Sequence, residues 1–354
     1  MWLRVEPRCY PRQLEALGLI KAFMVALTLG LPGLRAVAAR GADLLAGCNH
    51  SALSHAMRRG SSLKMIQGLL ASLTPCDAPG ASGLVAIDSM PLTLPATYQH
   101  GCARINRTTV GGGMLWAFAI DAARGVNPVR ILKVIEGAWH DSCLMEDVAL
   151  LANGPVYLMD RGFYAIDLVA RWIQHNVRFI VRAKLTNLRY AVEAHQGAPR
   201  QVKKLHLTLD AVVRLGRQDR ETHPRVRMVR AMLPSGEELI IVSNLLDARA
   251  EYLLESYRQR WQIERFHYYL KETLGLAHLY SFQKNGLAFL AHVAVLLCVL
   301  LLDASAKTKQ GTRTVDRLRE ALRQLRHACG AFGLWRRNTM TKGQTRHLKK
   351  KQNP

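Results

Sequence analysis

Three carboxylates in this sequence have the chemistry to hold divalent metal ions. Asp88 follows the apolar run at 83–87, Asp160 follows the apolar run at 154–159, and Glu264 lies in a helix-forming stretch. Two acids that close neighbouring strands meet in one crevice and repel each other unless a cation neutralises them. Hard oxygen ligands suit Mg²⁺ or Mn²⁺, and two ions about 4 Å apart can activate an attacking oxygen and stabilise a leaving one. Taken singly, an Asp at a strand end is usually a turn or cap residue.

The stretch around Glu264, residues 251–276, is predicted to form one long helix with a polar stripe. At about 100° per residue, four polar side chains fall near one line along it: Tyr257, Arg260, Glu264 and Lys271. A carboxylate between cations and a phenol suits a surface that meets a metal ion and a phosphate backbone. A solvated face with helix-spaced ion pairs is the simpler explanation on spacing alone.

The charge of the chain indicates a polyanionic partner. It has 49 Lys+Arg against 26 Asp+Glu, a formal net charge of +23. Such an imbalance is costly in self-repulsion unless a polyanion relieves it, so nucleic acid is the leading partner and an anionic membrane surface the alternative. The 7 cysteines are scattered without a C-x-x-C pair, which favours reduced thiols in the cytoplasm and argues against a zinc module.

One apolar run, residues 287–302, is shorter than the roughly 18 to 20 residues that span a bilayer and is interrupted by His292. We expect a buried core helix in which His292 is a hydrogen-bonded core residue. The basic start and apolar middle of residues 1–33 imitate a signal peptide, but two prolines and a polar segment precede the apolar part. The sequence therefore predicts no membrane association.

Residues 1 to about 80 are predicted to be helical. Within them, a helix, a turn at Gly47 and a short helix capped by Asn49 or Ser51 resemble a helix-turn-helix whose second helix, ending at Arg58 and Arg59, would enter a DNA groove. A plain helical hairpin with a basic end explains the pattern equally well.

After a Pro- and Gly-containing linker, the pattern changes to that of a mixed α/β sheet. Strands are predicted at 83–88, 114–122, 129–137, 154–160 and 177–183, with helices at 142–152 and 165–174. An antiparallel β insertion follows, with strands at 205–215, 225–233 and 237–245 that alternate Arg with apolar residues, so one face should be packed and the other positive. A last helix at 315–329 precedes a basic tail predicted to be disordered until it meets a polyanion.

Two motifs give the sequence a family resemblance. The box YLMDRGFY at 157–164, the segment AIDS at 86–89 and the spacing Y-x₂-R-x₃-E-x₆-K from Tyr257 to Lys271 resemble the DDE transposases of the insertion-sequence-four group over about residues 80–302. The resemblance implies a ribonuclease-H-like mixed sheet with the β insertion before the last catalytic helix. The helices before residues 80–302 and the basic tail after them match only in general character. We therefore expect four parts: a helical N-terminal DNA-binding domain (1–78), a catalytic core (79–184 and 246–304), the insertion (185–245), and a C-terminal helix with a basic tail (305–354).

The resemblance also implies roles. Asp88, Asp160 and Glu264 would ligate two Mg²⁺ or Mn²⁺ ions, with no organic cofactor. The partners would be double-stranded DNA, as terminal inverted repeats and target DNA, and a second copy of the chain in a homodimer assembled on DNA in the cytoplasm, at the nucleoid. Tyr257 and Arg260 would bind the 5′-phosphate side of the cleaved end, and Lys271 the backbone.

Two further functions stay open beside cut-and-paste transposition: a catalytically silent DNA-binding protein and a structure-specific nuclease. Arg161 would touch phosphate or form a structural ion pair. Relatives stack a flipped base on a tryptophan of the insertion, whereas this chain has no Trp between Trp172 and Trp261. Tyr190 or His206 would have to substitute, and Trp261 and Phe266 are expected in the core.

Overall fold

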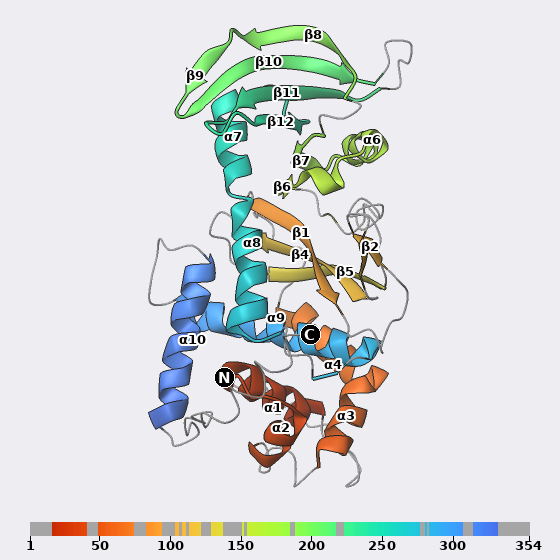
Figure 1. Ribbon diagram of the computed structural model, residues 1–354, viewed down its shortest axis with the longest axis vertical. Coiled ribbons are helices and arrows are strands. Elements are labelled where there is room, and N and C mark those ends of the chain that lie inside the picture. The colour runs from red at the N-terminus through yellow and green to blue at the C-terminus, as the bar shows by residue number, and fades with distance from the viewer. Residues whose placement is uncertain are drawn as a thin grey trace.

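The computed structural model describes residues 16–40, 49–73, 83–93, 103–105, 108–110, 113–121, 129–136, 151, 154–184, 188–216, 223–276, 280–281, 283–306 and 314–331. Strands occupy the upper and middle parts of the elongated molecule and helices the lower part (Figure 1). The helices α7 (Ala250–Arg258) and α8 (Trp261–Tyr268) run along the long axis and connect these parts. The predicted helix at 142–152 and the basic tail lie outside the described residues, apart from Leu151.

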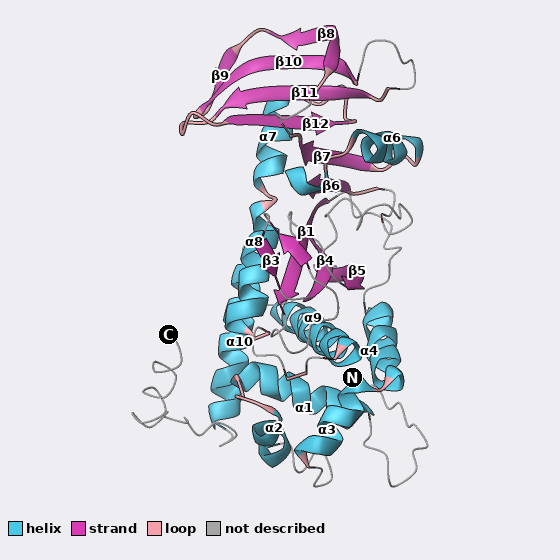
Figure 2. Cartoon of the chain, turned by 45° about the vertical axis from the view of Figure 1, so that its right-hand side comes forward, coloured by secondary structure: helices cyan, strands magenta, loops and turns pink. Residues whose placement is uncertain are grey.

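The helical part is built around one apolar helix, α9 (Lys284–Ala306). The helices that pack against α9 are α1 (Ala16–Leu29), α3 (His50–Arg58), α4 (Gly60–Leu73) and α10 (Thr314–Ala331), while α2 (Leu34–Arg40) lies against α3 (Figure 2). Residues 284–304 are long and apolar enough to cross a membrane, but 78% of the most apolar stretch is buried inside the protein. Because the other helices supply its apolar surroundings, α9 is a core helix, as predicted.

His292 is a hydrogen-bonded core histidine, as predicted. Its Nδ1 lies 2.7 Å from the carbonyl oxygen of Ala288, and its Nε2 lies 3.5 Å from the side-chain amide nitrogen of Gln67. Burial lowers the pKa of His292, although the bond to Ala288 opposes this effect. The predicted cap of α3 is also present, since Asn49 Oδ1 accepts a hydrogen bond from the backbone N–H of Ala52.

The sheet is mixed, as predicted. Within the described residues it has ten strands, in the order β5-β4-β1-β6-β7-β12-β11-β10-β8 with β9 paired to β10, and β6 lies parallel to both β1 and β7. The strands are β1 (Leu84–Thr93), β4 (Gly113–Asp121), β5 (Val129–Glu136), β6 (Val156–Met159), β7 (Arg178–Arg182), β8 (Tyr190–Gly197), β9 (Arg200–Val202), β10 (Leu205–Leu215), β11 (Arg225–Met232) and β12 (Glu238–Ser243).

Four short or polar strands were not anticipated: β8, β9 and the hairpin of β2 (Ala103–Ile105) and β3 (Thr108–Val110). β8 is largely exposed, so it lacks the apolar alternation by which half-buried strands are found in a sequence. Helix α6 (Ile166–Gln174) covers one face of the sheet at β6 and β7. On the other face, α7 packs on β7 and β12, α8 on β1 and β4, and α9 on β5. The two faces therefore have separate apolar cores.

The predicted positive face of the β insertion is wrong. Arg227 is buried and lies 2.6 Å from Asp210, and Arg230 lies 2.6 Å from Glu238. Two further arginines of these strands share one acid, Glu193: Arg214 and Arg225. Each of these arginines contacts an acid on another strand of the sheet, and that pairing depends on strand register.

The predicted long helix at 251–276 is interrupted. α7 ends at Arg258, a tight turn follows at Gln259 and Arg260, and a π-helical turn at Tyr269–Thr273 follows α8. In the tight turn, the backbone N–H of Arg260 bonds to the carbonyl of Tyr257, three residues back, which tightens the helix. Gln259 and Arg260 keep right-handed helical backbone angles, so α8 continues in nearly the direction of α7 (Figure 1).

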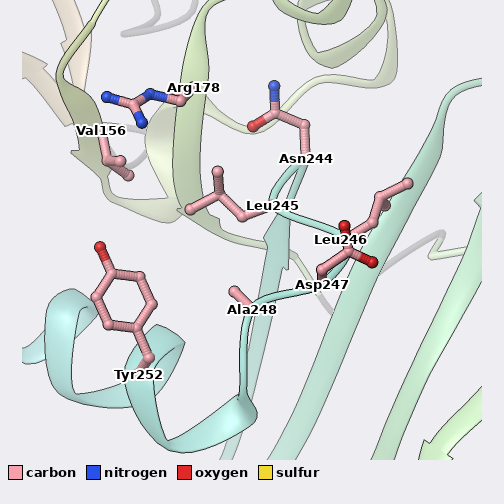
Figure 3. Close-up of a pocket in the computed structure, with 8 residues that line it drawn as sticks. All are labelled: Val156, Arg178, Asn244, Leu245, Leu246, Asp247, Ala248 and Tyr252. Carbon is pink, nitrogen blue, oxygen red and sulfur yellow. The ribbon is translucent and has the colours of Figure 1, made fainter.

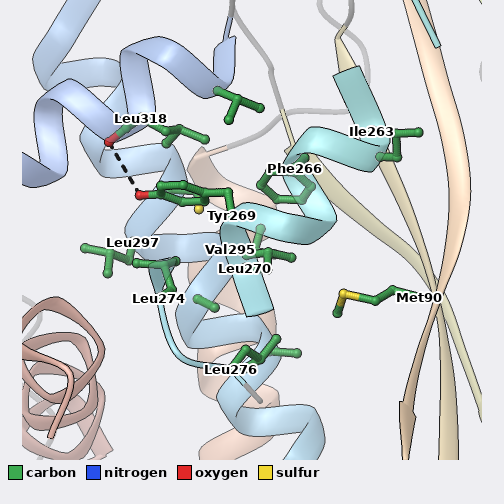
Figure 4. Close-up of a cluster of buried hydrophobic side chains, with 14 of the residues drawn as sticks. Met90, Ile263, Phe266, Tyr269, Leu270, Leu274, Leu276, Val295, Leu297 and Leu318 are labelled. Carbon is green, nitrogen blue, oxygen red and sulfur yellow. Dashed lines mark hydrogen bonds between the residues drawn. The ribbon is translucent and has the colours of Figure 1, made fainter. Parts of the chain in front are cut away.

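The apolar side of α8 and of the π-helical turn is buried against α9 and α10. Ile263, Phe266, Tyr269 and Leu270 point into this cluster (Figure 4), and the Tyr269 hydroxyl donates to the carbonyl of Leu318 at 3.4 Å. This packing fixes which side of α8 remains available to face the sheet.

Candidate active site

The first two predicted acids lie side by side on parallel strands. Ile87 of β1 pairs with Met159 of β6, so the next residue on each strand is an aspartate, Asp88 and Asp160. Neighbouring strands lie about 4.8 Å apart, and side chains at matching positions point to the same face. Two residues earlier, the paired Ala86 and Leu158 belong to the core shared with α7 to α9. The aspartates therefore lie on the face of the sheet that these helices cover.

The expectation that both aspartates close their strands is wrong for Asp88. β6 does end before Asp160, where a 3-10 turn begins at Arg161. β1 instead continues to Thr93, and Asp88 itself pairs with Phe118 of β4. Asp88 thus lies mid-strand, at the point where β1 loses β6 as a neighbour, because β4 is long enough to support the rest of β1.

The third acid, Glu264, is bound by Arg260. Arg260 Nη2 donates to Glu264 Oε1 at 2.7 Å, and the guanidinium lies 5.6 Å from the ring centre of Tyr257. Arg260 is only 7% exposed. Burial opposes its charge, but Tyr257, Asp160 and Glu264 together raise the pKa of Arg260, so it remains a cation.

Tyr257 connects this group to Asp160. Its hydroxyl donates to Asp160 Oδ1 at 3.4 Å. Burial, with a further contribution from Asp160, raises the pKa of Tyr257 to about 12 in spite of the opposing charge of Arg260. The phenol therefore stays protonated near neutral pH and can serve as a donor. Three residues of the predicted polar stripe, Tyr257, Arg260 and Glu264, are thus in contact in spite of the break in the helix.

A residue that sequence reasoning missed, His267, lies against Asp88. Its Nδ1 is 3.8 Å from Asp88 Oδ2, and its side chain is 12% exposed. Burial, assisted by the charge of Lys271, lowers the pKa of His267 to about 3, so the ring is neutral and the contact is not an ion pair. His267 follows Glu264 by three residues, and that helical spacing was the available signal.

The remaining predicted DNA contacts lie in two places. Lys271 is half-buried in the π-helical turn and Arg161 is exposed beside Asp160. Arg58 and Arg59 end α3, in the helical part (Figure 1). Arg58 is half-buried and bonds to Ser54 through its backbone oxygen at 3.0 Å and its hydroxyl at 2.6 Å, whereas Arg59 is exposed.

The predictions made for two aromatic residues, Phe266 and Trp261, have different outcomes. Phe266 is fully buried, as predicted, whereas Trp261 is 60% exposed, so its predicted core position is wrong. Trp261 begins α8, and at about 100° per residue its side chain lies roughly opposite Ile263 and Phe266, on the side of the helix away from the core. Tyr190 and His206 were considered as substitutes for the insertion tryptophan of relatives. Tyr190 accepts a hydrogen bond from Arg230 at 2.9 Å, and His206 is exposed.

The acids offer the donors that a hard divalent ion prefers, but Glu264 is occupied by Arg260. Among the residues that the structure describes, no three or more His, Cys, Asp or Glu side chains are grouped closely enough to hold one ion. Asp88 and Asp160 supply adjacent carboxylates, and Glu264 lies on α8, which packs on β1. The residue types thus fit Mg²⁺ or Mn²⁺, and the third ligand requires exchange of the Arg260 contact.

A cavity of about 510 Å³ lies at the other end of β6 (Figure 3). It is lined by Val156, Arg178, Asn244, Leu245, Leu246, Asp247, Ala248 and Tyr252. The amide of Asn244 bonds to the backbone of Phe179 and Val177, so it holds the strand ends together. Because Val156 begins the strand that Asp160 follows, the cavity is separate from the acids.

Comparison with known proteins identifies the family. Residues 82–302 match the family described as "Transposase DDE domain". The chain is 27% identical over 180 residues to the probable transposase for insertion sequence element IS5377 of Geobacillus stearothermophilus, a match that covers 48% of this chain and 45% of that protein, so it spans less than half of the relative.

A cryo-EM structure of the piggyBac transposase synaptic complex with hairpin DNA is similar with a TM-score of 0.49 at 11% identity, covering 94% of this chain and 75% of that one. The family match includes the two adjacent aspartates and Glu264. Because that match extends over more than half of the sequence, the chain belongs to the family of transposases with a DDE domain.

Proposed function

We propose that this protein is a cut-and-paste DNA transposase of the insertion-sequence-four group, with a ribonuclease-H-like core. It cleaves the ends of an insertion sequence and joins the 3′-hydroxyl ends to target DNA. The observation that supports this most is the register of β1 and β6, which brings Asp88 beside Asp160 on the face covered by the helix of Glu264.

Asp88, Asp160 and Glu264 would hold two divalent ions, Mg²⁺ or Mn²⁺. When bound, such ions activate the attacking oxygen and stabilise the leaving oxygen. Adjacent carboxylates repel each other, so a cation beside Asp88 and Asp160 would reduce this repulsion and stabilise the folded state. Glu264 would give up Arg260 as it joins them, which frees the guanidinium for a phosphate of the DNA.

The polar side chains of α7 and α8 would position the DNA end. Tyr257 offers a protonated hydroxyl and Arg260 a permanent charge on the 5′-phosphate side of the cleaved strand, as charge-assisted donors to phosphate oxygens. Lys271 would hold the backbone, and the exposed Arg161 lies beside Asp160 where it can reach the same strand. These groups bind the strand, and the direct joining of oxygen to phosphorus needs no organic cofactor.

The rest of the chain would recognise and hold double-stranded DNA. Its net charge of +23 suits a phosphate backbone, and α3, with Arg59 exposed at its end, would enter the inverted repeat. We assign residues 1–78 to DNA binding, 79–184 and 246–304 to catalysis, 185–245 to the insertion and 305–354 to a basic extension. Two copies would assemble on paired ends in the cytoplasm, at the nucleoid.

The test is cleavage of DNA that carries the inverted repeats flanking the coding region. With Mg²⁺, the parent chain should nick and join these ends, and Asp88→Ala, Asp160→Ala and Glu264→Ala should each lose cleavage while still shifting the same DNA in a gel. Full cleavage by any of these variants would contradict the assignment of these three residues as metal ligands. Cleavage without joining would indicate a nuclease, and binding without cleavage a silent descendant.

A further inference from the structure

The two oxygens of the Asp88 carboxylate have different surroundings. Oδ1 accepts a hydrogen bond from the backbone N–H of Ser89 at 2.8 Å. Oδ2 lies 3.8 Å from Nδ1 of His267, which is longer than a hydrogen bond of about 3 Å but close enough for a small shift to form one. The backbone therefore fixes one oxygen, and an imidazole faces the other.

We propose that His267 is a positioning residue that orients the Asp88 carboxylate for binding of the divalent ions. This inference rests on the proposed function, since it gives a partner to one of its three acids. A side chain that bonds to a ligating group fixes the direction of that group's lone pairs, and loss of such a partner weakens metal binding.

The place of His267 on α8 suits this role. It follows Glu264 by three residues, so both side chains project from neighbouring parts of the helix surface. α8 packs against β1 and β4, and the His267 side chain is enclosed between helix and sheet. The same turn of helix thus presents Glu264 to the site and sets the direction of Asp88 on the strand opposite.

The contrast with Arg260 explains why an imidazole suits this position. Arg260 neutralises Glu264 at 2.7 Å and so competes with any ion for that carboxylate. The His267 ring lies 3.8 Å from Asp88 Oδ2, so it borders this carboxylate without the short ion pair that Arg260 forms with Glu264. A lysine or arginine at this position would neutralise the negative charge of Asp88 that attracts an ion.

Two substitutions separate orientation from packing. His267→Asn keeps a polar atom near the place of Nδ1 but leaves empty space, whereas His267→Leu fills the space and removes the polar atom. Mn²⁺ binding to the full-length chain, measured from the loss of the free-ion signal in electron paramagnetic resonance, should weaken about 10-fold in His267→Leu and stay near the parent value in His267→Asn. Melting temperatures would be recorded for both variants.

If His267 only fills space, Mn²⁺ affinity should fall more in His267→Asn than in His267→Leu. The reason is that the core tolerates Leu better than a buried amide with empty space beside it. Mn²⁺ affinity that is unchanged in His267→Leu, or lower in His267→Asn than in His267→Leu, would overturn the proposal. His292→Leu is the matched control: it removes another buried, neutral imidazole, in α9, and should leave Mn²⁺ affinity unchanged.

An Asp88→Asn variant distinguishes this inference from the function on which it rests. If Asp88→Asn binds Mn²⁺ as tightly as the parent chain, the ions are not held at Asp88, and the proposed function falls together with the role of His267. If Asp88→Asn loses the ion but His267→Leu keeps it, only the role of His267 is overturned.

Discussion

Two regions of the same ten-stranded sheet treat their acids differently. In the insertion strands, Asp210, Glu193 and Glu238 each contact an arginine at 2.6 to 2.8 Å. At the junction of β1 and β6, the side chains in contact are neutral: Asp88 faces the ring of His267, and Asp160 accepts a hydrogen bond from the Tyr257 hydroxyl, while the charge of Arg260 acts on Asp160 from farther away. An arginine neutralises the carboxylate that it contacts, whereas a neutral partner leaves the negative charge available to a ligand.

Glu264 belongs to both classes. It is the third acid of the proposed site, yet it is paired with Arg260 as the insertion acids are paired with their arginines. The difference lies in exposure, since the Glu264 side chain is half-exposed while Asp210 is buried. The Glu264 carboxylate is 37% exposed although Arg260 is buried, so an ion can reach Glu264 more easily than it can reach Asp210.

The largest expected effect is on cleavage by Asp160→Asn. This change keeps the size of the side chain and removes its charge, so strand cleavage in Mg²⁺ should fall by about 10³-fold, as expected for loss of several kcal/mol of stabilisation by the ions. The melting temperature should change little or rise, because repulsion from Asp88 is relieved. A gel assay of end cleavage, with DNA binding measured in parallel, checks this, and cleavage within a few-fold of the parent would contradict the comparison.

Asp210→Ala should instead affect folding. Asp210 and Arg227 are both buried and lie 2.6 Å apart, so removal of the acid leaves a buried guanidinium without its counter-charge. Such a loss costs about 3 to 5 kcal/mol, which urea unfolding would measure. Cleavage per folded molecule should not change, and a stable Asp210→Ala variant with reduced cleavage would mean that this acid, too, serves the site.

Tyr257→Phe should have an intermediate effect on cleavage. The hydroxyl donates to Asp160 over a long 3.4 Å, so its loss should cost about 1 kcal/mol, or roughly 5-fold in cleavage rate, with no change in melting temperature. Because the pKa of Tyr257 is raised to about 12, the parent and the variant should share one pH profile up to pH 9. If the ratio of the two cleavage rates instead changes with pH at any value up to pH 9, the phenol titrates during the reaction.

Glu193→Gln should have the smallest effect. Arg225 and Arg214 lower the pKa of Glu193, but these pairs are largely exposed, so the variant should lose less than about 1 kcal/mol of stability. A carboxyl with a lowered folded pKa contributes stability above its unfolded pKa and loses it as the pH falls. The difference between parent and variant should therefore disappear on acidification from pH 6 towards pH 3, and urea unfolding at both ends would test it.

Much of the site could be predicted because its signals are local in the chain. The apolar runs before Asp88 and Asp160 predicted their strands, and the spacing from Tyr257 to Glu264 predicted a shared polar face that survives a break in the helix. Helix α9 was also predictable, since a long apolar run is stable only where it is buried away from water. Periodicity reports how each segment divides its residues between core and solvent, and that division needs no knowledge of the neighbours.

Other features depend on partners that the sequence does not name. Strand β8 is polar, and its place at the sheet edge follows from pairing with β10. The arginines of β11 look like a positive face until register supplies their acids, and Trp261 looks like a core residue until the tight turn at Arg260 presents it to solvent. Pairing and register are set by contacts between distant segments, which local patterns do not encode.

By itself, the sequence determined the strongly positive charge, the residue types of the site and the elements that carry them. Only the tertiary structure decided that Ile87 pairs with Met159, that Asp88 lies mid-strand, and that His267 faces it from α8. The physical reason is that the chemistry of a side chain depends on one residue alone. The distance between two carboxylates depends instead on the packing of every element between them.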